Sequence, residues 1–524
     1  MEKVNCVLAF FIGKTLKTKK TKMESEIMNK FVNALNNETN KTVTANGAAA
    51  FKSTKSYVLD LFALGGSARN ADPIALHDMI TKAFNENPEL AARVVFYLGD
   101  IRGGQGFRDL FKAGLKIMVR RYPNIVRKIM RDIPEFTRWD MMYQLEGTAL
   151  ENDMFALLKE VSFNALNKNE SHLIFKWLKS KASSDETNRL MRKTARKFDM
   201  SEADYRRFIK RGRAPLKLVE TLMSTGRSDE IEYSALSSKA ALKYREAFKR
   251  NDGERFNEFV EAVVKGEATM NMSVAYPHEI VSKYMGGGGY WNESVKAYDA
   301  SLEAAWKSLE HYFGDGGILN VTDVSGSMLS TISNDSKVTC MDVAVSLGIY
   351  TAEHNTGYFK NMFMTFSNRP SLIKLSDKDS LRDKIIRTKS ADWGMNTDIN
   401  AVFKLLLTTA TQNRVPQKDL PKTILIVSDM QFDACTNMKS TNYNEWSAKF
   451  AQAGYELPQI VFWQVSTESN VPVKVLTPGT AVVSGFSPSI LKYIYEGEIN
   501  TPYDFMLEVV MTERYDRIGE AFRY

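Results

Sequence analysis

The chain of 524 residues predicts a multidomain fold, in which an all-α array of helical repeats precedes a doubly wound α/β domain. Between residues 55 and 265 apolar side chains recur at helical spacing, and the turns are short. From about residue 317, short apolar runs alternate with helical segments, which is typical of parallel strands covered on both faces. Four consecutive glycines at 286–289 lie between the two patterns and suit a linker. We therefore expect a partly disordered N-terminal extension (1–54), a basic helical domain (55–285), a glycine linker with a connecting helix (286–312) and the α/β domain (313–524).

The composition is that of a globular protein, with 44% hydrophobic and 25% charged residues. The three cysteines, Cys6, Cys340 and Cys435, are too far apart for a metal knuckle and too few for a disulfide framework. A reducing compartment, the cytoplasm, is therefore expected. The apolar run at 7–12 is far shorter than the ~20 residues that span a bilayer, so we expect no membrane anchor. A signal peptide is the alternative, but lysines follow the run where a cleavage site would lie, and an unstructured extension is preferred.

The charge is distributed unevenly along the chain. Residues 101–250 hold 32 Lys and Arg against 19 Asp and Glu, whereas residues 301–524 hold 21 against 25. Such a basic block favours a polyanionic partner, RNA or DNA, for the helical domain. Alternatively, the cations lie on solvated helix faces that never converge. Composition leaves both interpretations open.

The helical pattern is clearest around residue 90. Asn87 is a suitable N-cap, and Pro88 suits the first helical position, where its missing N–H is not needed. The apolar positions that follow at i, i+3, i+4 and i+7 are Ala91, Val94, Val95 and Leu98. Further helices are expected from Pro123, Pro134, Ser201, Leu216 and Ala240. Stacked antiparallel helix pairs, similar to HEAT repeats, would bury these apolar stripes against one another.

Two basic segments of this domain are candidate RNA-binding sites. The glycine-rich turn at 102–108 could bring backbone N–H groups close to a phosphate, although it lacks the Lys-Ser/Thr ending of a P-loop; an ordinary interhelix turn is the alternative. The segment 205–213 places aromatic residues among five cations, so it could pair with phosphates and stack on unpaired bases. Alternatively, its aromatics are core residues and its cations are solvated. The candidate residues are Arg102, Arg108, Arg206, Arg207, Lys210, Arg211 and Arg213.

The α/β domain should follow a connecting helix at 293–312. Its expected strands lie at 317–322, 362–366, 423–427 and 460–465. Ligands of such sheets bind at the carboxyl ends of the strands, and polar residues gather there. They are Asp323, Ser325, Ser327, Thr397 and Asp429. This all-oxygen set with few formal charges suits a hard cation that retains waters, Mg²⁺ or Mn²⁺.

These five residues closely resemble the metal-ion-dependent adhesion site of von Willebrand factor A domains, whose pattern is Asp-x-Ser-x-Ser, then Thr, then Asp. The resemblance implies direct ligation of the metal by Ser325 and Ser327, and ligation largely through waters by Asp323 and Asp429. Thr397 would join depending on conformation. One position would stay open for an acidic side chain or phosphate of a partner. Alternatively, the five residues are helix caps and turn formers, and the site is unused.

The order of a basic helical domain and an A domain resembles the Ro autoantigen family. In that family a ring of helical repeats, the TROVE module, binds small noncoding RNAs and the ends of misfolded RNAs, and the A domain closes the ring. Three segments resemble more nearly an uncharacterised family of plants and large DNA viruses with the same layout. They lie at 100–109, 244–252 and 275–281. The resemblance implies RNA binding at the level of the architecture.

We therefore expect a noncatalytic, ring-like ribonucleoprotein component. Its helices would bind noncoding RNA, and its A domain would bind Mg²⁺ and an acidic protein partner. None of the five histidines, His77, His172, His278, His311 and His354, stands in a recognisable catalytic motif. A protein-interaction scaffold that docks an acidic partner at the metal is the alternative. A metal-dependent nuclease is disfavoured, because two serines and a threonine are a poor base for activating water.

Overall fold

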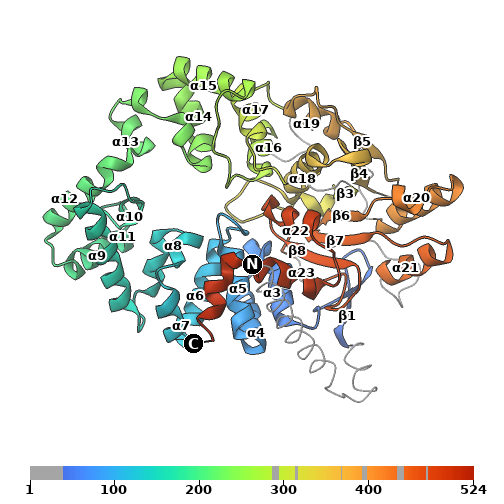
Figure 1. Cartoon of the computed structure of the whole chain (residues 1–524), viewed down its shortest axis with the longest axis horizontal. Helices are drawn as coiled ribbons and strands as arrows, with labels where there is room; N and C mark the ends of the chain where they lie inside the picture. Colours follow the sequence, from blue (N-terminus) through green and yellow to red (C-terminus); the bar gives the residue numbers. More distant parts are fainter. Residues whose placement is uncertain are drawn as a thin grey trace, which may run out of the picture.

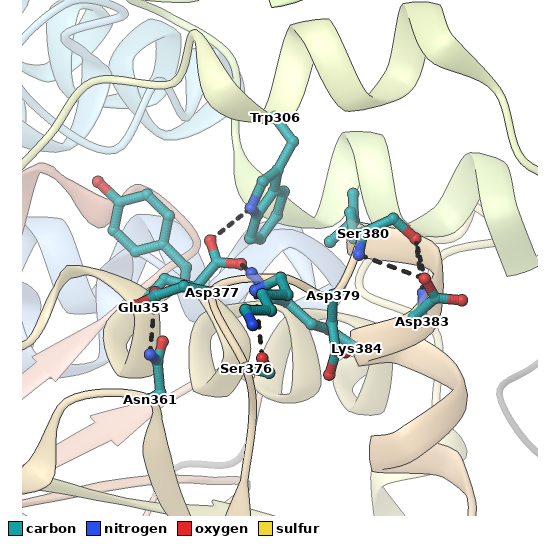
Figure 2. A network of polar contacts seen from close by, with 12 residues as sticks. Trp306, Glu353, Asn361, Ser376, Asp377, Asp379, Ser380, Asp383 and Lys384 are labelled. Atoms are coloured by element: carbon teal, nitrogen blue, oxygen red, sulfur yellow. Dashed lines mark hydrogen bonds and ion pairs between the residues drawn. The ribbon is translucent and has the colours of Figure 1, made fainter.

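A computed structural model describes residues 39–285, 294–312, 317–367, 369–391, 398–432, 442–467 and 470–523. It confirms the predicted fold class, because a helical region precedes a six-stranded sheet with flanking helices. The helices of the first region are α3 (Tyr57–Gly65), α4 (Pro73–Glu86), α5 (Pro88–Gly99), α6 (Arg108–Arg121), α7 (Pro123–Ile129), α8 (Ile133–Phe136), α9 (Glu151–Asn167), α10 (Ile174–Trp177), α11 (Asp185–Lys197), α12 (Glu202–Arg213), α13 (Val219–Ser224), α14 (Ser238–Asn251), α15 (Gly253–Lys265), α16 (Pro277–Met285) and α17 (Ala300–Lys307). Figure 1 shows that they form an arc.

The predicted caps start several of these helices. The Asn87 side chain accepts a hydrogen bond from the Leu90 N–H at 3.1 Å, and Pro88 occupies the first position of α5. Ser201 caps α12 in the same way, accepting from the Asp204 N–H at 3.1 Å. The connecting helix is shorter than expected: α17 begins only at Ala300, because Asp299 is extended and caps it.

The sheet has the strand order β5-β4-β3-β6-β7-β8, in which every pairing is parallel except that of β5 with β4. Its strands are β3 (Ile318–Asp323), β4 (Met362–Phe366), β5 (Leu372–Lys374), β6 (Thr423–Ser428), β7 (Gln459–Gln464) and β8 (Thr480–Ser484). Its helices are α18 (Cys340–His354), α19 (Leu381–Lys389), α20 (Ile399–Gln412), α21 (Asn442–Gln452), α22 (Leu491–Glu496), α23 (Pro502–Val510) and α24 (Asp516–Glu520). The four predicted strands are present. The other two lack a clear apolar run, because β5 has three residues and β8 contains Thr, Ala and Ser.

Both ends of the helical arc contact the α/β domain, so the chain closes on itself (Figure 1). At one end α16 packs on α18, and at the other α3 packs on β8 while α24 packs on α5. The Gly66 N–H donates to Ser484 Oγ at 2.8 Å across this second contact. A Cβ atom at Gly66 would lie 2.3 Å from the Ser484 carbonyl oxygen, so the close approach requires glycine here.

The glycine-rich turn after α5 is part of this closure. The Asp100 carboxylate is fully buried and accepts hydrogen bonds from Arg514 and from the Tyr515 hydroxyl of the C-terminal helices. The Gln105 side-chain oxygen accepts from the Phe486 and Ser487 N–H groups, both at 3.1 Å. These polar groups form hydrogen bonds with other segments of the same chain, which favours the interpretation as an interhelix turn over that as a phosphate cradle.

Part of the expected N-terminal extension is an ordered hairpin of β1 (Lys41–Val43) and β2 (Ala49–Phe51). Phe51 exchanges two backbone hydrogen bonds of 2.9 Å with Val471, and Ala48 and Ala50 are buried. The hairpin is ordered because these small apolar residues and Phe51 pack against the α/β domain. Residues 1–38 and the glycines at 286–289 lie outside the described residues. Within the described part, no helix combines the length and the apolar character needed to cross a bilayer.

Candidate metal centre and cationic groove

The predicted metal ligands lie at the centre of the sheet edge. Strands β3 and β6 are adjacent and parallel, and the chain winds outward from them in both directions. Such a point, where the strand order reverses, is the usual ligand site of an open α/β sheet. Asp323 is the last residue of β3, and Asp429 directly follows β6. The two carboxylates therefore meet at this edge.

Hydrogen bonds connect four of the five predicted ligands. Ser325 N–H donates to Asp323 Oδ1 at 2.9 Å, and the hydroxyls of Ser325 and Ser327 are 3.1 Å apart. The Ser327 hydroxyl in turn hydrogen-bonds the Asp429 carboxylate. Sequence reasoning missed the neighbouring Ser428, whose hydroxyl donates to Asp323 Oδ2 at 2.6 Å and orients that carboxylate. Thr397 lies outside the described residues.

The electrostatics of this edge favour a bound cation. Burial, together with the charge of Asp429, raises the pKa of Asp323 to about 7, and burial also raises the pKa of Asp429. Neither carboxylate forms an ion pair with a Lys or Arg of the described residues. Two buried carboxylates with adjacent hydroxyls fit a hard divalent cation, which would offset their repulsion. The described residues hold no cluster of three or more His, Cys, Asp and Glu side chains, so hydroxyls and waters would supply the other ligands.

A second feature is a groove of about 1100 Å³ that is lined by residues of the helical region. Its lining residues come from α8, α10 and α14, from the segments between them, and from Arg102 and Val274. Six cations and two carboxylates line it. The cations are Arg102, Arg131, Arg138, Lys176, Lys239 and Lys243, and the carboxylates are Glu135 and Glu220. We call it the cationic groove.

Three of the six cations have no carboxylate partner among the described residues. Arg131, Arg138 and Lys239 pair with acidic side chains. Arg102, Lys176 and Lys243 form no such pair, and the Arg102 guanidinium donates to the Glu135 carbonyl oxygen. The groove therefore carries a net positive charge, of which Glu135 and Glu220 offset a part. The hydrogen bond to Tyr244 and, to a smaller extent, the charge of Glu220 raise the pKa of Lys243.

Aromatic rings lie among these cations. The Arg138 guanidinium stacks 4.1 Å from the centre of the Trp177 ring, and Lys176 Nζ is 5.8 Å from the same ring. Trp139 meets the His172 ring edge to face at 5.6 Å. Burial lowers the pKa of His172, so this imidazole is neutral at neutral pH. Half-buried rings beside unneutralised cations can stack on bases while the cations bind phosphates.

The predicted RNA-binding residues do not lie together. Of the seven, Arg102 alone lines the cationic groove. Arg213 donates to the backbone oxygen of Phe175 at 2.8 Å and so supports the fold. Arg108 is exposed at the start of α6. The remaining four, Arg206, Arg207, Lys210 and Arg211, are exposed on α12.

The aromatic residues between the α12 cations belong to the core. Tyr205 is fully buried and the Phe208 side chain is 9% exposed, so neither ring can stack on a base. This helix is therefore amphipathic, with its aromatic side chains in the core and its cations in solvent, as the alternative interpretation expected. Its cations can still pair with phosphates.

Sequence reasoning missed the other groove residues, although they share a signal. Three cation–aromatic pairs of adjacent residues, Arg138-Trp139, Lys176-Trp177 and Lys243-Tyr244, line the groove. Each pair lies in a helix or beside one, and nothing in the local pattern indicates that the three converge.

Comparisons with known proteins match both regions of the chain. Residues 44–132 and 170–317 match a family model described as a domain of unknown function, DUF2828. Residues 318–517 match another, DUF7788. The two matches meet where the sheet begins, at β3.

Two individual proteins are similar over most of the chain. The crystal structure of the RO (RSR) protein of Deinococcus radiodurans is similar at 12% identity and a TM-score of 0.39, over 85% of this chain and 100% of that chain. The uncharacterized protein L728 of Acanthamoeba polyphaga mimivirus is 27% identical over an alignment 520 positions long, which covers 90% of this chain and 87% of the viral protein. The predicted resemblance to a family of large DNA viruses is confirmed by this relative, to which the chain is similar in both its helical and its α/β region.

Proposed function

We propose that the protein binds RNA, with a single-stranded segment held in the cationic groove. The observation that carries the proposal is the convergence of Arg102, Lys176 and Lys243 on one groove, where they form no salt bridge with the described carboxylates and lie beside half-buried tryptophans. Cations would bind phosphates independently of sequence, and the rings would stack on unpaired bases. The exposed α12 cations could bind further phosphates of the same RNA.

The test is a titration of a short fluorescein-labelled oligouridylate, followed by fluorescence anisotropy over a series of salt concentrations. Lys176→Glu combined with Lys243→Glu is expected to weaken binding roughly tenfold or more, because two phosphate contacts become repulsive. The slope of log affinity against log salt should fall by about 1.4, or about 0.7 for each lost contact to a single strand.

The controls locate the binding surface. Lys404→Glu combined with Lys418→Glu changes the net charge by the same amount, at two exposed positions of the α/β domain. This control variant should bind RNA with nearly unchanged affinity. Arg206→Glu combined with Arg207→Glu tests the outer face of α12. Loss of binding only in this α12 variant would move the RNA site out of the groove. Absent or salt-insensitive RNA binding by the unaltered protein would contradict the proposal.

For the α/β domain we propose that Asp323, Ser325, Ser327 and Asp429 hold Mg²⁺ or Mn²⁺, with Thr397 as the fifth ligand. The bound cation would supply an open coordination position rather than an activated water, so the role is noncatalytic. Ser327 is exposed above the two buried carboxylates, which would give an acidic partner access to the cation. This exposure also supports the second candidate function, a scaffold that docks an acidic protein. Ser325→Ala should weaken such docking and leave RNA affinity unchanged.

A further inference from the structure

The turn of the N-terminal hairpin lies on the loop that carries Asp429. Thr44 Oγ1 donates to the Phe432 carbonyl oxygen at 2.6 Å. The Ala45 N–H donates to the side-chain oxygen of Gln431 at 2.6 Å, and the Asn46 amide donates to the Gln431 carbonyl oxygen at 2.7 Å. The hairpin turn thus contacts a loop far away in the sequence, since Asn46 and Gln431 are 385 positions apart.

Gln431 links the hairpin to the carboxylate. Its backbone N–H donates to Asp429 Oδ1 at 3.0 Å, while its side chain and carbonyl accept from the hairpin. A shift of Gln431 would therefore move a donor that orients Asp429. The Asp429 carboxylate also accepts from Ser327, so the same shift would alter its geometry toward that predicted ligand.

The loop has a backbone conformation that needs outside support. Met430 is 2% exposed and has φ of 62°, in the left-handed region that a residue with a Cβ atom seldom adopts. Such a conformation is unfavourable for a residue with a Cβ atom and persists where the surrounding structure holds it. The hairpin is well placed to hold it, because Phe51 is fixed to Val471 by two backbone hydrogen bonds. Phe432 is held from the other side by the rings of Phe366 and Phe462.

We infer that the hairpin turn is a positioning element of the cation site. Thr44 and Asn46 hold the Gln431–Phe432 segment so that the Asp429 carboxylate faces the cation. Neither side chain touches the cation itself. The affinity for the divalent cation therefore depends on residues that the sequence pattern assigns to the N-terminal extension. This inference rests on the proposed cation binding.

The experiment measures Mn²⁺ affinity of the full-length protein, with free Mn²⁺ quantified by electron paramagnetic resonance. Loss of the hydrogen bond to the loop should weaken Mn²⁺ binding roughly fivefold in Asn46→Ala. Thr44→Val should weaken it at least as much, because it also removes the hydrogen bond of 2.9 Å that Thr44 Oγ1 accepts from the Ala48 N–H of the turn. Thr44→Ser keeps the hydroxyl and should restore the affinity. Asn40→Ala is the matched control: the Asn40 amide donates to the Ser53 carbonyl within the same hairpin region and does not reach the loop. Asn46 is exposed, so its substitution leaves a folded protein.

The outcomes separate this inference from the proposed function. Weaker Mn²⁺ binding in Asn46→Ala and Thr44→Val, with Asn40→Ala and Thr44→Ser unchanged, supports the inference. If the unaltered protein binds Mn²⁺ and both variants bind it equally well, the positioning role is wrong while the cation site stands. If the unaltered protein binds no Mn²⁺, the proposed cation site is wrong and the inference is overturned with it.

Discussion

Replacement of Asp100 by alanine is expected to lower the free energy of unfolding by about 3 kcal/mol, the lower end of the range for breaking a buried ion pair, because the Arg514 side chain left behind is 37% exposed. The Asp100 side chain is fully buried. It accepts from both Arg514 nitrogens that face it, from the Tyr515 hydroxyl at 3.1 Å and from the Arg102 N–H at 2.9 Å. Removal of the carboxylate leaves these donors without their acceptor at the contact that closes the arc.

Urea unfolding followed by circular dichroism measures this loss. Asp153→Ala is the matched control, because Asp153 pairs with Arg127 at 3.2 Å between two side chains that are 42% and 49% exposed. An exposed pair of this kind contributes about 1 kcal/mol or less. Equal stability losses in the two variants would contradict the role given to Asp100. Asp100→Ala should also disturb the Gln105 contacts to the segment before α22, which protection from hydrogen exchange at Phe486 and Ser487 would report.

The second large effect concerns pH and the cation site. Without a cation, the pKa of Asp323 lies near 7 in the folded chain and near 4 in the unfolded chain. The folded state therefore binds this proton more tightly, so the corresponding stability is complete below about pH 4 and is lost as the pH rises through about 7. Asp429 acts in the same direction, since burial raises its pKa too. The contribution of Asp323 and Asp429 should thus make the cation-free protein melt at a lower temperature at about pH 8 than at about pH 5.

Mg²⁺ should reverse this trend, because it binds the charged carboxylates. We expect the rise in melting temperature caused by MgCl₂ over EDTA to be larger at about pH 8 than at about pH 5. Asp323→Asn should abolish both the Mg²⁺ effect and this part of the pH dependence. Asp335→Asn, at an exposed position of the following loop, should change neither. A Mg²⁺ effect that is equal at both pH values would show that the cation does not bind these carboxylates.

Local patterns allowed much of the fold to be predicted. Asn87 caps its helix as expected, a helix begins directly after Ser201 as expected, and the four long apolar runs form the central strands. The predicted metal ligands that the structure describes come together, because two adjacent parallel strands must end at the same edge. Strand β5 escaped prediction, because its burial alternates over only three residues.

The cationic groove could not be predicted in the same way. Lys176 lies on α10, Lys243 on α14 and Arg138 in the segment after α8, and their meeting depends on the angle at which successive helix pairs stack. The strip on α12 gave a stronger local signal, but its rings face the core. The closely spaced cations and aromatics of α12 therefore belong to an amphipathic helix, whose rings are buried and whose cations are exposed.

The sequence by itself determined the class of the two domains and the oxygen-bearing side chains of Asp323, Ser325, Ser327 and Asp429 that meet at the sheet edge. Periodicity is a local property, and in a parallel sheet the residues that follow the strands all lie at the same edge. The tertiary structure alone decided three other features: the cationic groove, the closure through Asp100 and the contact of the hairpin with the Asp429 loop. Each joins residues far apart in the chain, and their meeting depends on how whole elements pack, for which no neighbouring residue carries a signal.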